Sequence, residues 1–166
     1  MRAFLGAALF TLAWTLVGCG AAARLRARAR TLWELCRMME LLRFELARFA
    51  PPMPELFAQL GKTAPGAGGE ISRRLYDSLN RLGDEEFSDL WERALGDLSG
   101  PERETMAALG RVLGRYGAQE ELAALDVCRE RLMDLSGEAE RTAKERGRLY
   151  VGLSAAVGAV ASVLML

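Results

Sequence analysis

The stretch TLWELCRMMELLRFELARF, residues 31–49, decides the fold class. Its apolar residues recur at intervals of three and four, which places them on one side of an α-helix. Six charged residues lie at other positions, and Pro51 and Pro52 end the pattern because proline cannot continue a helix. We therefore expect a long amphipathic helix with this inward stripe: Leu32, Leu35, Cys36, Met39, Leu42, Leu46 and Phe49.

Two stretches without charged residues lie outside this region, at residues 3–23 and 149–166. As helices they would measure roughly 31 Å and roughly 27 Å, close to the thickness of the hydrocarbon core of a membrane. Each stretch predicts a transmembrane helix. The expected organisation is an N-terminal transmembrane helix over 1–23, a cytoplasmic helical domain over 24–148 and a C-terminal transmembrane helix over 149–166.

Basic residues beside the two stretches predict the topology, because positive charge next to a span is retained on the cytoplasmic side. Arg2 alone precedes the first stretch, and no charged residue follows the second. We expect a cell-membrane protein with two spans, a cytoplasmic central domain and both termini outside. The topology-determining residues are Arg24, Arg26, Arg28, Arg30, Lys144, Arg146 and Arg148.

Both stretches also contain small residues four positions apart, a spacing that lets helix backbones approach closely in lipid. Alanine and glycine are common throughout this chain, so the spacing reflects either helix packing or composition alone. The candidate residues for packing in the membrane are Gly18, Ala22, Gly152, Ala156, Gly158 and Ser162.

An alternative interpretation of the first stretch is a cleaved signal peptide. Residues 16–19 read LVGC and resemble the lipobox of a bacterial lipoprotein, which would make the chain an exported helical lipoprotein lipidated at Cys19. The arginines that follow oppose export of the downstream chain and favour a retained anchor.

The central residues predict an all-α bundle of about six helices, whose long first and last helices continue into the terminal stretches. Four glycines and Pro65 within residues 61–69 predict a flexible loop. This loop does not match a phosphate-binding loop, because Glu70 and Ile71 follow where that motif needs lysine and then serine or threonine. Helix signals such as Asp84 as an N-cap and Pro101 at a first turn set the remaining bounds. Expected helices cover 54–60, 71–82, 85–98, about 102–116 and from about Gln119 onward.

Composition argues against an enzyme and against nucleic-acid binding. The 22 basic and 22 acidic residues balance, so no single-sign field attracts nucleic acid, and without histidine the commonest general base and metal ligand are absent. Cys19, Cys36 and Cys128 are too far apart for a thiolate metal site, and we expect each to be a small buried hydrophobe. We predict no catalytic residue, no metal, no cofactor and no small-molecule substrate.

Several segments in a fixed order resemble one family. They are LRFELARFAPPMP at 42–54, FSDLWERAL at 87–95, LGRVLGRYGAQEE at 109–121 and KERGRL at 144–149, between an N-terminal stretch followed by arginines and a C-terminal one. This ordered set is similar to the stage III sporulation protein AB family of endospore-forming bacteria. That family resembles the cytoplasmic helical domain of the inner-membrane platform protein of type II secretion and type IV pilus machines.

The resemblance implies a non-enzymatic platform or adaptor in the channel complex between mother cell and forespore. It implies a place in the mother-cell-side membrane, contact with membrane lipid and the other stage III A proteins, and binding to the secretion-type ATPase. The glycine-bounded turn within 109–121 is a candidate contact surface, or alternatively a connection alone. Its candidate partner-binding residues are Arg111, Arg115, Tyr116, Gln119 and Glu120.

Overall fold

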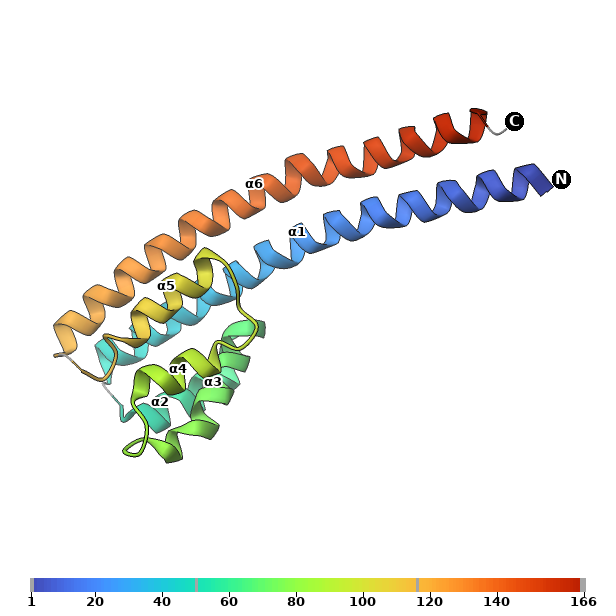
Figure 1. Cartoon of the computed structure of the whole chain (residues 1–166). Helices are drawn as coiled ribbons and strands as arrows, with labels where there is room; N and C mark the ends of the chain where they lie inside the picture. Colours follow the sequence, from blue (N-terminus) through green and yellow to red (C-terminus); the bar gives the residue numbers. More distant parts are fainter. Residues whose placement is uncertain (1, 50, 116, 165–166) are drawn as a thin grey trace. The chain divides into compact units, whose positions relative to one another are not determined.

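The computed structural model describes the backbone of residues 2–49, 51–115 and 117–164, and the side chains of 19–49, 51–115 and 117–147. Over these ranges the chain is helical and forms no strand, as predicted (Figure 1). The elements are α1 (Arg2–Arg48), α2 (Met53–Thr63), α3 (Gly66–Ser78), the 3-10 helix η1 (Leu79–Arg81), α4 (Phe87–Ala94), α5 (Pro101–Gly110) and α6 (Ala118–Leu164).

The chain divides into two compact units. The terminal unit holds Met1–Arg30 and Gly137–Leu166, and the central unit holds Thr31–Ser136. Two helices of 47 residues, α1 and α6, each contribute to both units, which agrees with the expected long first and last helices. The predicted domain bounds at 24 and 148 concern the membrane and stay a prediction.

Trp91 forms the centre of the central unit. Its side chain is fully buried, its ring packs edge-on against Phe57 at 6.0 Å between centroids, and its Nε1 donates to the Met106 carbonyl oxygen at 2.7 Å. An unpaired indole N–H in the core would cost free energy, so the folded state keeps this hydrogen bond. The bond in turn holds the ring in one orientation. Trp91 therefore ties α4 to α2 and α5, and apolar residues of α1, α3 and α6 complete the core.

The glycine-rich run is helical, so the predicted loop over residues 61–69 was wrong. Helices α2 and α3 occupy all of it except Ala64 and Pro65. A Cβ on Gly68 would lie 2.7 Å from the Met38 Cβ, and one on Gly61 would lie 2.8 Å from the Arg73 Cγ. These glycines serve close packing of helices rather than flexibility, which the composition alone did not reveal.

Two helices are shorter than predicted. Helix α4 has Glu86, not Asp84, at its N-cap, and α5 ends at Gly110 rather than near position 116. A Cβ on Gly110 would overlap the Trp91 ring, so the close approach of α5 to α4 requires glycine there. Beyond it, Gly114 has φ +79°, a left-handed conformation that glycine adopts readily and that is incompatible with helix continuation. Pro101 does begin α5, as predicted.

The inward stripe of α1 is confirmed from Leu32 to Leu42, whereas Leu46 is half-buried and Phe49 is exposed. Phe49 is 64% exposed because the helix ends at Arg48 and the core does not extend beyond it. Conversely Glu34, which the pattern placed on the charged face, is only 7% exposed. Its Oε2 accepts from the Ala67 backbone N–H at 2.9 Å, so α1 supplies the carboxylate that caps α3.

In the terminal unit, residues of α1 and α6 pack against each other. Ala22 is 2% exposed, and a Cβ on Gly147 would meet the Ala22 Cβ at 3.8 Å. Within the described residues, no helix combines the length and the apolar character that crossing a membrane requires. The structure does not describe the side chains of most residues in the predicted spans at 1–23 and 149–166. Both spans therefore stay predictions.

Candidate interaction surfaces

The core of the central unit contains two thiols, those of Cys36 and Cys128. Within the described residues, no three His, Cys, Asp or Glu side chains are grouped so that they could hold a metal ion. Burial raises the pKa of the Cys36 thiol, and burial raises that of Cys128 to about 12. Both cysteines are buried as predicted, whereas Cys19 is exposed, so the expectation of a buried Cys19 was wrong. The core thiols remain protonated and unreactive at neutral pH.

The α5–α6 connection displays most of the predicted partner-binding residues. Arg111, Arg115, Gln119 and Glu120 are exposed, and Tyr116 lies outside the described residues. The connection is held by two contacts: the Gly114 N–H donates to Glu121 Oε1 at 2.7 Å, and the Arg115 guanidinium pairs with Glu86 at 2.5 Å. The turn is therefore structurally anchored, and Arg115 is engaged within the chain.

One side of α1 is rich in exposed aromatic and arginine residues, which the sequence pattern did not single out. Trp33 is 58% exposed and Phe44 is 51% exposed, and their spacing of eleven residues puts them on the same helix face. The Arg48 guanidinium lies over the Phe44 ring, 5.7 Å from its centroid. We name this surface the Trp33 face, and its residues are Trp33, Arg37, Glu40, Phe44 and Arg48.

A groove adjoins the Trp33 face in the central unit, between α1 and α6. Its volume is about 630 Å³, and Arg129 of α6 contributes to its wall. The Arg43 Nε donates to Asp126 at 2.6 Å across the two helices, and the Arg129 Nε lies 4.0 Å from the same carboxylate. The Trp33 face and this groove together carry more positive than negative charge. They hold two carboxylates, Glu40 and Asp126, and four arginines, Arg37, Arg43, Arg48 and Arg129. The residue types are those that dominate binding energy at protein interfaces.

A second groove in the central unit separates α5 from α6 and is mainly apolar. Its volume is about 410 Å³, and Val127 on its rim is 69% exposed. Alanines on both helices leave the space open, since their side chains are short. The lining residues are Thr105, Ala108, Leu109, Val112, Ala123, Ala124, Val127, Cys128 and Arg131.

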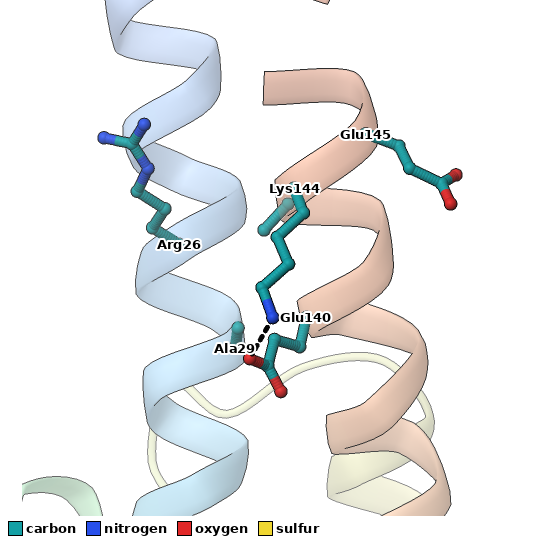
Figure 2. Close-up of a pocket in the computed structure, with 6 residues that line it drawn as sticks. Arg26, Ala29, Glu140, Lys144 and Glu145 are labelled. Carbon is teal, nitrogen blue, oxygen red and sulfur yellow. Dashed lines mark ion pairs between the residues drawn. The ribbon is translucent and has the colours of Figure 1, made fainter. Parts of the chain in front are cut away.

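The predicted topology residues belong to the terminal unit. Arg24, Arg26, Arg28, Arg30, Lys144 and Arg146 are exposed, and the side chain of Arg148 lies outside the described residues. Of the predicted packing residues, Ala22 is buried, and the side chains of the others lie outside the description. A hollow of about 600 Å³ separates the two helices here (Figure 2). We name it the Arg26 hollow, and its lining residues are Arg26, Ala29, Glu140, Ala143, Lys144 and Glu145.

Over the described residues the protein is helical, and its two long helices, α1 and α6, pack with short helices in the central unit. The sequence model of the family described as stage III sporulation protein AB matches residues 3–166. The chain therefore belongs to the stage III sporulation protein AB family, which confirms the resemblance and gives the chain a role in sporulation. No curated protein and no solved structure matches the chain.

Proposed function

We propose that the chain is a non-enzymatic adaptor of the mother cell to forespore complex, held in the mother-cell-side membrane by two spans and bound to the complex's secretion-type ATPase. Membership of the family supports the sporulation role. Two features of the described residues support an adaptor over an enzyme: the core thiols are held in the unreactive protonated form, and the exposed surface is rich in residues suited to protein contact.

The main support for the adaptor role is the exposure of the Trp33 face. Exposed tryptophan and arginine are the residues most enriched at energetic centres of protein interfaces. Trp33 and Phe44 supply apolar area, and the excess of arginines over carboxylates fits an acidic surface on the partner. We propose that the ATPase presents such a surface, with apolar side chains between its carboxylates.

The exposed end of the α5–α6 connection is the second candidate contact for the ATPase. Arg111 is exposed and forms no ion pair with a described residue, so it can meet a partner carboxylate without breaking an internal bond. Arg115 would first have to leave Glu86.

Binding of the purified ATPase to the full-length chain in lipid nanodiscs tests both surfaces. We expect Trp33→Ala combined with Phe44→Ala to raise the Kd at least tenfold, because loss of one hot-spot residue costs about 2 kcal/mol. Tyr76→Ala is the matched control, since Tyr76 is a 47% exposed aromatic on α3. If the double variant binds normally and Arg111→Glu binds more weakly, the contact lies at the α5–α6 connection. If the parent chain does not bind the ATPase, the adaptor role is refuted.

Membrane anchoring and orientation are tested by labelling. A variant with Cys19, Cys36 and Cys128 replaced by serine carries one new cysteine at Ser99, which is exposed in the central unit. We expect protection from an impermeant maleimide in intact cells and labelling after the membrane is opened. Labelling in intact cells would contradict a cytoplasmic central domain.

The exported lipoprotein remains the second candidate because of the LVGC sequence and the exposed position of Cys19. Lipidation requires the chain to be cleaved before Cys19 and would remove the first predicted span. Mass spectrometry of the mature chain distinguishes the two functions: an intact, unmodified N-terminal segment supports the adaptor, and a diacylglycerol group on Cys19 supports the lipoprotein.

A further inference from the structure

The groove between α5 and α6 in the central unit, which we name the α5–α6 groove, is apolar and open to solvent. Its volume is about 410 Å³. Ala108 of α5 and Ala123 of α6 are exposed on its two walls, and Val127 is 69% exposed on its rim. Alanine side chains are short, so the backbone of a third helix can approach closely here. The Thr105 hydroxyl in the wall donates to the Pro101 carbonyl oxygen at 2.8 Å, and the groove therefore favours an apolar occupant.

An exposed charged residue of α6 lies toward each end of this groove. Arg131 belongs to the lining, and Glu120 lies about one turn before Ala123, where the lining on α6 begins. Neither Arg131 nor Glu120 forms an ion pair with a described residue. Their spacing of eleven positions places them on the same face of α6, about 16 Å apart along its axis. A partner that lies along the groove therefore meets a negative group at one end and a positive group at the other.

The residues along this side of α6 form a row that a second helix can match. Glu120, Ala124, Val127 and Arg131 are separated by four, three and four positions, the spacing of one helix face. A helix that lies along α6 places side chains opposite each of them, as amphipathic helices do in apolar grooves. The small Ala124 leaves room for a bulky apolar side chain. The matching helix thus has a basic residue opposite Glu120, an acidic residue opposite Arg131 and apolar residues between them.

A second copy of this chain has the matching pattern but not the matching direction, and this step rests on the proposed function. The spacing of the row reads the same from either end, so an antiparallel copy would set Glu120 against Arg131 and Ala124 against Val127. Two copies that enter one membrane through the C-terminal ends of α6 have parallel α6 helices, which would instead set Arg131 against Arg131. Like charges repel, so the occupant is a helix of another protein.

We propose that the α5–α6 groove binds an amphipathic helix of another protein. The apolar residues of that helix fill the groove, and its acidic and basic residues pair with Arg131 and Glu120. The residues chosen to test ATPase binding, Trp33, Phe44 and Arg111, do not line this groove. Binding at the groove and binding of the ATPase can therefore succeed or fail independently.

The probe is a synthetic helix with the required pattern, a fluorescein-labelled peptide of residues 117–135. Its core-face residues Leu125, Cys128 and Leu132 are replaced by glutamine, which removes most of the apolar surface outside the row from Glu120 to Arg131. A free peptide is not anchored in the membrane, so it can lie antiparallel to α6. Fluorescence anisotropy measures its binding to the full-length chain in lipid nanodiscs, and we expect saturable binding.

Charge reversal tests the pairing. Arg131→Glu in the chain should weaken binding about fivefold, because attraction to Glu120 of the peptide becomes repulsion. A peptide that carries Glu120→Arg should restore the affinity for this variant. Arg141→Glu is the matched control, since Arg141 is an exposed arginine of the same helix outside the groove lining, and it should change the affinity less than about twofold. Ala108→Phe fills the groove from an exposed position and should weaken binding of both peptides.

Four results would overturn the proposal. The first is absence of saturable peptide binding by the parent chain. Equal losses for Arg131→Glu and Arg141→Glu, without rescue by the reversed peptide, would reduce the attraction to net charge. Displacement of the peptide by oleate would make the groove a site for a lipid chain. A dimer of the full-length chain that Arg131→Glu dissociates would assign the groove to a second copy, and it would also contradict the shared membrane orientation of the proposed function.

Discussion

At the scale of single residues, the central unit depends on glycines that allow helices to touch. A Cβ on Gly68 would lie 2.7 Å from the Met38 Cβ and 3.1 Å from the Glu34 carbonyl oxygen, and neither atom can move without the backbone of α1. The close contact of α1 with α3 therefore tolerates no larger side chain at this position.

We expect Gly68→Ala to lower the free energy of unfolding by about 1–3 kcal/mol, the usual cost of overpacking. Gly137→Ala is the control, because this helical position has open space around its Cβ and should be stabilised by about 0.5–1 kcal/mol. Urea unfolding of the full-length variants in detergent, followed by circular dichroism, measures both changes. Equal effects of the two substitutions would contradict the packing role.

Cys36 and Cys128 lead to a prediction about pH. Burial raises the thiol pKa of both, so the folded state disfavours the thiolate, and stability should decline as the pH rises above the ordinary thiol range toward 12. In a Cys19→Ser variant at pH 8, we expect iodoacetamide to modify neither thiol until urea unfolds the chain. Rapid modification of the folded chain would show that the core opens readily.

At the scale of elements, sequence patterns predicted the helices better than their ends. The three-and-four spacing located α1 and α6, and two prolines correctly ended α1. Two of these ends involve residues that are distant in the sequence: Glu34 of α1 caps the start of α3, and the Trp91 ring lies against Gly110, the last residue of α5. Such contacts have no local signal, so a glycine-rich helix such as α3 resembles a loop when it is judged by composition.

The α5–α6 connection gives an element-scale prediction. Glu121 is 9% exposed and accepts a hydrogen bond from the Gly114 N–H, whereas the neighbouring Glu120 is exposed. Glu121→Ala should cost about 1–3 kcal/mol of stability, because the N–H group loses a charged partner. Glu120→Ala should change stability by less than about 0.5 kcal/mol. Thermal unfolding of the two variants checks the difference, and similar melting temperatures would refute it.

The candidate surfaces were harder to predict than the fold. The glycines of the α5–α6 connection identified its exposed residues. The ion pair between Arg115 and Glu86 joins residues 29 positions apart, and no sequence pattern indicates it. Trp33 and Phe44 were missed because an aromatic residue among charged ones in an amphipathic helix is usually assigned to neither face. Their exposure follows from the contacts of α1 with α3 and α6, which only the folded unit defines.

At the scale of the whole molecule, the central unit holds its own core. Leu32 and Leu42 of α1, Trp91 of α4, and Leu125 and Leu132 of α6 are fully buried and all lie within Thr31–Ser136. A fragment of residues 31–136 should therefore be helical and unfold in one cooperative transition. A fragment of residues 53–115, which lacks both long helices, should not. Far-ultraviolet circular dichroism against temperature distinguishes these outcomes, and a cooperative transition of the shorter fragment would contradict the assignment.

The Glu34 cap of α3 also bears on how the chain is made. A ribosome releases the N-terminal side first, so the carboxylate that α3 needs is already in place on α1 when α3 emerges. Helix α6 emerges last, and until then the side of α1 that pairs with Asp126 and Cys128 has no cover. Newly synthesised chains stalled before α6 should thus be the species that chaperones and proteases recognise.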